Sequence, residues 1–335
     1  MIPRLSSRQP HRLPWTLERL VYERSLALGS ALDVTTAAAY DSHLNSYLNF
    51  CHLHQRPIEP TADTLSFYIV WLSHHIEPRS VDSYLSGITS RLEPFFPTVR
   101  EIRRLPLVAR TLKGCKRRLS RPVSQKGPLG VHQITHVISV LRASHDFDDI
   151  LFCAMLTTGF TTLQRLGELT WPDNPRSRSW RKVALRHSVT TDSSGSSYLL
   201  PTHKTDRHHA GARVLLPTPP ILPFDGLITF RRYLQTRDAL HPYHPALWVT
   251  RAGTVPTRSW FLRHLHHFVP SRTISGHSMR AGGATALACA GFAPALIQSA
   301  GRWSSTAFEG YIRQHPFILH AIMQPGGMRR GPHHR

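Results

Sequence analysis

The sequence predicts a mainly helical protein of the α+β class, in which a helical bundle precedes a second helical domain with a small antiparallel sheet. Apolar residues recur at the helical period through most of the chain, whereas short β-branched runs are confined to residues 180–217. A stretch of Pro, Gly, Ser and charged residues separates two segments, each long enough to form a core. We therefore expect a basic arm with an entry helix (1–30), a helical domain (31–121), a linker (122–128), a second domain (129–324) and a mobile basic tail (325–335).

The helical domain is expected to be a compact bundle of four or five helices. In its first helix Tyr40, Leu44, Tyr47 and Cys51 recur at i, i+4, i+7 and i+11, which places them on one face. Apolar residues repeat with the same period in three further segments, which predicts the other helices. These segments contain or begin with Pro and cover residues 56–75, 77–96 and 106–122.

The second domain is expected to mix helices with a sheet. Residues 132–144 restart the helical period, and residues 149–171 are apolar enough to form a buried helix or helix pair. Between residues 180 and 217, short β-branched runs broken by Gly and Asp predict a small antiparallel sheet. Helical patterns return from Leu227 onward.

The charge of the chain indicates the kind of partner. Lys and Arg total 41 against 20 Asp and Glu, so the formal net charge is +21. A folded chain this basic repels itself unless a polyanion neutralises it, and nucleic acid is the usual polyanion. A membrane-surface protein and an ordinary solvated basic surface remain as alternatives. No apolar run reaches the length of a membrane span, and the Arg-, Ser- and Pro-rich start lacks the apolar core of a secretory signal.

The cysteines and histidines argue against a disulfide framework and against a metal site. The four cysteines are scattered without a paired spacing, which fits a reducing, intracellular compartment. The 23 histidines form short clusters that lack a partner cluster at ligand spacing. We therefore expect neither a metal nor a small-molecule cofactor.

Two arginines in apolar stretches are candidates for holding a phosphate. Arg165 lies in "TTLQRLGELTW" beside Glu168, and Arg280 lies in "GHSMRAGGATALA" beside His277, both in patterns expected to be helical. The guanidinium fork donates two parallel hydrogen bonds and keeps its proton, which suits the non-bridging oxygens of a phosphodiester. An exposed surface arginine is the default interpretation of each, but a buried guanidinium without a partner is costly.

Four further residues could take part in chemistry at a phosphate. Lys204 falls between two short apolar runs, near the tip of an expected hairpin, where an ammonium group can serve as a general acid. His277 stands one helical turn before Arg280, on the same face. A phenol such as Tyr311 is a competent nucleophile only when neighbouring groups ease its ionisation. Trp303 could donate its indole N–H, although a solvated lysine and core aromatic residues are the default interpretations.

Together these residues resemble the tyrosine recombinases, the phage-integrase superfamily. The resemblance covers about residues 127–320 and rests on five motifs in the order of that family. The stretches around Lys204 and Tyr311 are more specifically similar to recombinases of eukaryotic mobile elements such as Crypton-type transposons. The motifs are "RLGEL" at Arg165, Lys204 in its hairpin, "HSMR" at 277–280, "GRW" at 301–303 and "YIR" at Tyr311.

The resemblance implies a role for each of these residues. Tyr311 would attack the scissile phosphate and form a 3′-phosphotyrosyl link, while Arg165 and Arg280 clamp the non-bridging oxygens. Lys204 would protonate the departing 5′-oxygen, and His277 would assist proton transfer and orient the phosphate. The covalent link would conserve the energy of the broken diester, so that rejoining needs neither ATP nor metal.

One position departs from the family pattern. The family usually has His or Trp one residue after the glycine of this motif, whereas here Arg302 occupies that place and Trp303 follows. Either Arg302 supplies the donor, or a small helix shift lets Trp303 do so. Arg302 is also the best support for a second hypothesis, a catalytically silent DNA-binding protein derived from such an enzyme. A type IB topoisomerase is a more distant alternative.

The resemblance also implies how the chain would meet DNA. The first domain would be a core-binding domain of the SAM-like kind, which closes on duplex DNA together with the catalytic domain as a clamp. The family assembles as tetramers on DNA, and "FILHAIM" after Tyr311 could be a helix donated to a neighbour. A eukaryotic host would place the enzyme in the nucleus. We expect phosphate contacts from one basic run, with a solvated charge run as the alternative: Lys113, Lys116, Arg117, Arg118 and Arg121.

Overall fold

The structure is a computed structural model that describes residues 12–122, 126–202, 211–271 and 273–303. The chain divides into two compact units, residues 1–123 and 124–335, and each is described here by itself. Within the described residues no helix combines the length and the apolar character needed to cross a membrane.

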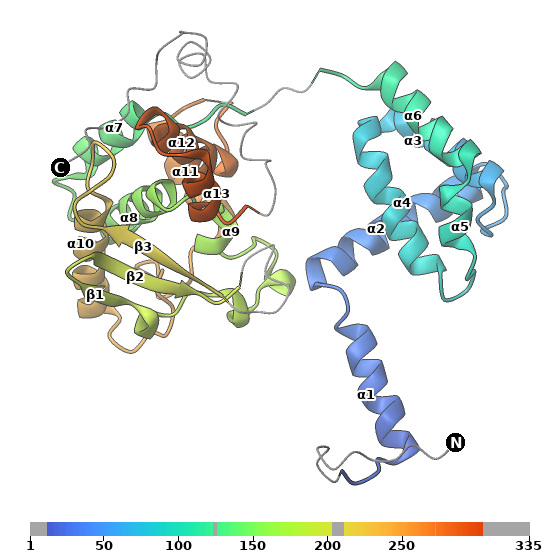
Figure 1. Cartoon of the computed structure of the whole chain (residues 1–335), viewed down its shortest axis with the longest axis horizontal. Coiled ribbons are helices and arrows are strands. Elements are labelled where there is room, and N and C mark those ends of the chain that lie inside the picture. Colours follow the sequence, from blue (N-terminus) through green and yellow to red (C-terminus); the bar gives the residue numbers. More distant parts are fainter. Residues whose placement is uncertain (1–11, 123–125, 203–210, 272, 304–335) are drawn as a thin grey trace, which may run out of the picture. The chain divides into compact units, whose positions relative to one another are not determined.

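The first unit is helical, as expected (Figure 1). None of the described residues of its first helix is buried, whereas the later helices share one apolar core around Tyr47, Tyr68 and Ile88. The close pairing of the second and fourth helices needs Gly87, because a Cβ there would lie 2.6 Å from Nδ1 of His43. The helices are α1 (Leu17–Gly29), α2 (Val34–Leu53), α3 (Ala62–His75), α4 (Pro78–Leu92), α5 (Val99–Arg104) and α6 (Pro106–Leu119).

The second unit combines helices with a three-stranded antiparallel sheet of order β1-β2-β3. The strands pair in a simple meander, and Tyr198 of the middle strand lies opposite Val214. The elements are α7 (Val131–Leu141), α8 (Phe147–Thr161), α9 (Leu166–Leu169), β1 (Thr190–Asp192), β2 (Gly195–Leu200), β3 (Ala212–Pro217), α10 (Gly226–Leu240), α11 (Arg258–Phe268), α12 (Gly276–Cys289) and α13 (Pro294–Ala300).

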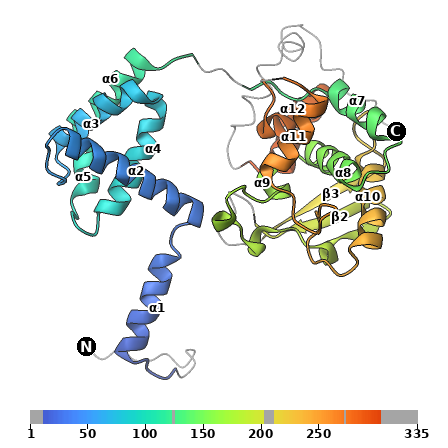
Figure 2. The ribbon, with the colours of Figure 1, turned by 180° about the vertical axis from the view of Figure 1, so that it is seen from behind.

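Helix α8 is the centre of the second unit. Its residues 150–160 are all buried, which explains why this segment lacks charged residues on every face. Helix α10 and the sheet lie on one side of α8, and α12 lies on the other side, as Figures 1 and 2 both show. The expected helix pair in residues 149–171 is therefore α8 followed by the short α9, with a turn between them.

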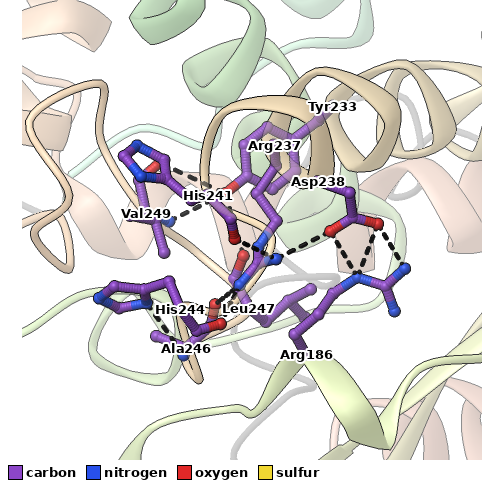
Figure 3. A network of polar contacts seen from close by, with 9 residues as sticks. All are labelled: Arg186, Tyr233, Arg237, Asp238, His241, His244, Ala246, Leu247 and Val249. Atoms are coloured by element: carbon purple, nitrogen blue, oxygen red, sulfur yellow. Dashed lines mark hydrogen bonds and ion pairs between the residues drawn. The ribbon is translucent and has the colours of Figure 1, made fainter.

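A buried arginine in α10 anchors the irregular segment that follows this helix (Figure 3). Arg237 is 0% exposed, and its Nη1 donates to Asp238 Oδ1 at 2.8 Å. Its guanidinium also donates to the backbone carbonyls of His241, His244 and Ala246. The bond to the Ala246 carbonyl is buried and the others are partly buried, so the guanidinium replaces hydrogen bonds that water could make only in part.

We predict that Arg237→Met destabilises the protein by about 3–5 kcal/mol, because the three carbonyls lose this donor and, among the described residues, Asp238 keeps only Arg186. Urea unfolding of the full chain, followed by tryptophan fluorescence, measures the loss. The control is Arg186→Gln, which removes the partly exposed ion pair to the same Asp238 and is expected to cost less than about 1 kcal/mol. Equal losses for the two variants would show that the buried contacts do not anchor the segment.

Candidate active site

Arg165 lies at a tight turn between α8 and α9. Leu163 has a positive φ of 53°, and the Gln164 N–H donates to the Gly159 carbonyl at 2.9 Å. Arg165 itself is extended, with φ −75° and ψ 141°, and immediately precedes α9. The expectation that Arg165 sits inside a helix is therefore wrong. The turn interrupts the helix between α8 and α9 and leaves Arg165 in extended backbone.

Glu168 joins two guanidinium groups. Its side chain is 7% exposed, and its Oε1 accepts from Arg165 Nη1 at 3.0 Å. Its Oε2 accepts from the Arg165 backbone N–H at 3.1 Å and from Arg302 Nη2 at 2.8 Å. One buried carboxylate thus orients two arginines from distant parts of the chain. Because it balances only one of the two positive charges, the group of three side chains keeps a net positive charge. The sequence showed Glu168 as a neighbour of Arg165 but held no signal for its contact with Arg302.

Arg280 of α12 ties the turn to the end of α13. It is 1% exposed, and its two Nη atoms donate to the backbone carbonyls of Leu163 and Gly301. The Trp303 ring covers the guanidinium, with 4.0 Å between Arg280 Cζ and the ring centroid. A cation over an aromatic face is attracted by the ring quadrupole, most strongly where water is excluded. Arg280 therefore holds three segments together.

The Ala- and Gly-rich part of α12 brings this helix close to its neighbours. A Cβ on Gly282 would collide with the Leu129 carbonyl, and one on Gly283 would collide with the Phe160 carbonyl. Both glycines are buried. The absence of side chains at these positions allows α12 to pack against α8 at the distance that Arg280 needs to reach Leu163.

His277 lies in the first turn of α12, near the arginines. Its side chain is exposed, yet desolvation by surrounding atoms and the positive charges of Arg280 and Arg165 lower its pKa. The neutral imidazole is therefore the prevailing form at neutral pH. A neutral ring can accept a proton from one group or donate a hydrogen bond to another.

The backbone after α13 turns sharply. This turn separates Arg302 from Trp303, the two candidates for the position at which the resembled family has His or Trp (the His/Trp place). Arg302 has a positive φ of 56°, the Trp303 N–H donates to the Gln298 carbonyl at 3.1 Å, and the Arg302 N–H donates to the Ser299 carbonyl at 2.9 Å. This is the Schellman end of a helix, where glycine normally takes the left-handed position. The turn points Arg302 to Glu168 and Trp303 to Arg280, so the two side chains occupy different places without a shifted helix.

The structure thus brings Arg165, His277, Arg280, Arg302 and Trp303 into one region of the second unit. Two expected residues, Lys204 and Tyr311, lie outside the described residues.

The expected DNA-contacting residues lie at the end of α6 in the first unit. This helix buries Val108, Leu112 and Cys115, and its basic residues point to the other face. Basic side chains in a last turn also complement the helix dipole, so the cluster has a structural use besides any contact with DNA. Four of the five residues are exposed and Lys116 is partly exposed: Lys113, Lys116, Arg117, Arg118 and Arg121.

Comparisons with known proteins find similarity in structure alone. No family model matches the sequence, and no curated protein sequence matches it. The structure of the Tn1549 transposon integrase in complex with circular intermediate DNA aligns with a TM-score of 0.60 at 13% identity, over 91% of this chain and 97% of that chain. A lambda integrase dimer bound to a COC′ core site aligns with a TM-score of 0.56 at 13% identity, over 89% of this chain and 95% of that chain. A lambda integrase tetramer bound to a Holliday junction gives 0.55 at 14% identity, over 90% and 79%.

The chain has the fold of the tyrosine recombinases. This confirms the expected fold class, a helical bundle followed by a helical domain with a small antiparallel sheet. The superfamily that the motifs resemble agrees with this fold, and membership beyond the fold stays a prediction. The narrower similarity to Crypton-type elements stays a prediction.

We predict that Gly301→Ala destabilises the protein by about 1–3 kcal/mol, because its Cβ would overlap the Trp303 ring and displace it from Arg280. The matched control is Gly167→Ala in α9, whose Cβ would meet no described atom within 4 Å. Alanine favours a helix over glycine by up to about 1 kcal/mol, so the control should be neutral or stabilising. Urea unfolding followed by circular dichroism measures both, and an unchanged Gly301→Ala variant would refute the role of the stacked ring.

His277 should titrate with a pKa below the ordinary range of a histidine, because desolvation and two nearby arginines disfavour its charged form. An NMR titration of its ring proton should give a pKa below 6.5 in the free protein, and Arg165→Gln should raise that pKa by removing a neighbouring positive charge. Because the folded-state pKa is lowered, the stability that neutral His277 contributes is present above pH 6.5 and is lost as the pH falls through the folded pKa.

Arg213→Gln on β3 serves as the control and should leave the pKa of His277 unchanged, since Arg213 bonds to Thr190 and Ser197 of the sheet. His277→Gln assigns the resonance. A pKa of His277 at or above its ordinary value would contradict the arrangement described above.

Proposed function

We propose that this chain is a site-specific DNA recombinase that cuts and rejoins strands through a 3′-phosphotyrosyl intermediate. The observation that carries the proposal is the convergence of Arg165, His277 and Arg280, from two separate segments, in a chain with the tyrosine-recombinase fold. Charged donors held ready before the reaction stabilise a phosphorane-like transition state without reorganising at the moment of reaction.

In the proposed reaction Tyr311 attacks the scissile phosphorus, and the bond from phosphorus to the 5′-oxygen breaks. Arg165 and Arg280 neutralise the charge that grows on the non-bridging oxygens. His277, neutral at neutral pH, assists removal of the phenol proton, and Lys204 protonates the departing 5′-oxygen. One diester replaces another, so a second strand can reverse the step without an external energy source.

We assign the donor at the His/Trp place to Arg302. Its side chain is 12% exposed, its guanidinium is oriented by Glu168, and its Nε has no hydrogen-bond acceptor among the described residues. Trp303, in contrast, uses its ring face to cover Arg280. In this proposal Arg302 contacts the phosphate, and Trp303 positions Arg280.

Duplex DNA is the proposed partner of both units. The net charge of +21 supports this, as does the exposed basic end of α6, whose side chains we propose contact backbone phosphates independently of sequence. The lambda integrase tetramer and the Tn1549 transposon integrase among the similar structures support the further proposals of a tetramer on DNA and of an origin in a mobile element. In a eukaryotic host the enzyme would act in the nucleus.

The experiment that tests the function uses the full chain and a nicked suicide duplex, taken from DNA that flanks the coding sequence. We predict that the wild-type protein forms a covalent complex that resists denaturing electrophoresis. Tyr311→Phe should abolish this complex and still bind DNA, because only the nucleophilic oxygen is lost. Tyr243→Phe is the matched control, since this tyrosine is 97% exposed.

Each outcome of this experiment bears on the proposal. A wild-type protein that binds the duplex and never forms the complex would contradict catalysis and favour a catalytically silent DNA-binding protein. A complex that persists in Tyr311→Phe would show that another residue is the nucleophile.

A further inference from the structure

We infer that Gln164 and Tyr198, two fully buried residues outside the proposed catalytic set, form a positioning pair that holds the phosphate-binding arginines in place. Gln164 immediately precedes Arg165, and Tyr198 lies in the middle strand β2. The Gln164 Nε2 donates to the Tyr198 hydroxyl and to Thr162 Oγ1, the latter at 3.0 Å. This inference rests on the proposed function and adds two residues to its machinery.

The pair adds side-chain hydrogen bonds to a strained turn, which the Gln164 N–H already closes on the Gly159 carbonyl at 2.9 Å. Leu163 has a positive φ of 53°, and a non-glycine residue in the left-handed region costs about 1–2 kcal/mol. Such a conformation persists only where its surroundings enforce it. The amide of Gln164 bonds the turn both to itself, through Thr162, and to the sheet, through Tyr198.

Both guanidinium groups of the proposed clamp depend on this turn. Arg165 is the next residue along the backbone, so a shift of Gln164 moves it directly. Arg280 donates through Nη1 to the Leu163 carbonyl, so the same shift moves the acceptor that orients its guanidinium. A loosened Gln164 therefore misplaces two charged donors at once.

Tyr198 also lies close to the Glu168–Arg302 ion pair. Burial raises the pKa of Tyr198, and the charges of Arg302 and Glu168 act on it in opposite directions. The sheet thus reaches the site through a phenol that touches the turn and lies within electrostatic range of the ion pair.

Stability alone does not explain a glutamine at this position. The Gln164 Oε1 is buried and has no hydrogen-bond donor among the described residues. An unpaired buried acceptor costs about 1–3 kcal/mol, which an apolar side chain of similar size would avoid. Residues that break a local rule of folding are expected where function requires them.

The chain offers a matched control for Tyr198. Tyr233 is also fully buried, and both rings pack against Trp248, with centroid separations of 5.3 Å for Tyr233 and 6.2 Å for Tyr198. The Tyr233 hydroxyl bonds to the backbone of Leu247 and Val249, and it has no hydrogen bond to a described residue of the proposed site. Removing either hydroxyl deletes a buried hydrogen bond, but only Tyr198→Phe releases the turn.

The test compares single-turnover cleavage of two suicide duplexes by the full chain. One carries an ordinary scissile phosphate, and the other carries a methylphosphonate, in which a methyl group replaces one non-bridging oxygen and removes the charge. An uncharged centre depends less on correctly placed guanidinium groups, so a defect caused by their misplacement should be relieved. Both diastereomers of the methylphosphonate are measured.

We expect Tyr198→Phe to cleave the phosphate duplex about 10- to 100-fold more slowly than wild type, as for a small displacement of catalytic groups. Its rate on at least one methylphosphonate diastereomer should stay near the wild-type rate. Tyr233→Phe should keep the wild-type ratio of the two rates. Equal slowing of Tyr198→Phe on all duplexes, or no slowing on any, would overturn the inference.

A second variant tests the pair if Tyr198→Phe folds poorly, which a thermal melt would reveal. Gln164→Met removes the amide with little change of volume, and it should show the same loss confined to the phosphate duplex. The double variant should be no slower than the slower single variant, because the two residues act as one unit. If the rate losses of the two single variants multiply in the double variant, the two residues act independently and the inferred pair is refuted. If the wild-type protein cleaves neither duplex, the proposed function itself is wrong and the inference falls with it.

Discussion

A guanidinium group withdrawn from water must find its hydrogen-bond acceptors within the protein, and this requirement organises the candidate site. Glu168 serves Arg165 and Arg302, while Arg280 uses two backbone carbonyls and the face of Trp303. The described contacts supply fewer negative charges than positive ones. The region therefore stays electropositive, which favours an anion. Desolvation, together with these positive charges, lowers the pKa of the nearby His277 and keeps its ring neutral.

The acceptors reach their places through unusual backbone conformations. Leu163 and Arg302 both have positive φ, and each ends or interrupts a helix at the point where a carbonyl or a side chain must face Arg280 or Glu168. Left-handed residues other than glycine are sparsely populated, and they persist where surrounding contacts enforce them. Here those contacts are the buried ion pairs and the hydrogen bond between Gln164 and Tyr198.

Arg237 shows that burial of an arginine does not by itself mark a reactive site. Its guanidinium is as buried as that of Arg280, but its hydrogen bonds go to Asp238 and to backbone carbonyls of the segment that it anchors (Figure 3). Arg280 instead donates to the carbonyls of Leu163 and Gly301 and lies under the Trp303 ring. The two arginines therefore differ in their contacts, because Arg237 is paired directly with the Asp238 carboxylate.

The sequence by itself determined the helical bundle, the position of the sheet, the basic character of the chain and the candidates Arg165, His277 and Arg280. Each follows from composition, from a repeat of a few residues or from a short motif. Only the tertiary structure decided that Arg165 stands at a turn, that Glu168 joins it to Arg302, that Trp303 covers Arg280 and that Gln164 meets Tyr198. Glu168 and Arg302 lie 134 positions apart along the chain, and Gln164 and Tyr198 lie 34 apart. Trp303 and Arg280 belong to neighbouring motifs. Local periodicity carries no information about which distant side chains meet once the helices and the sheet have packed.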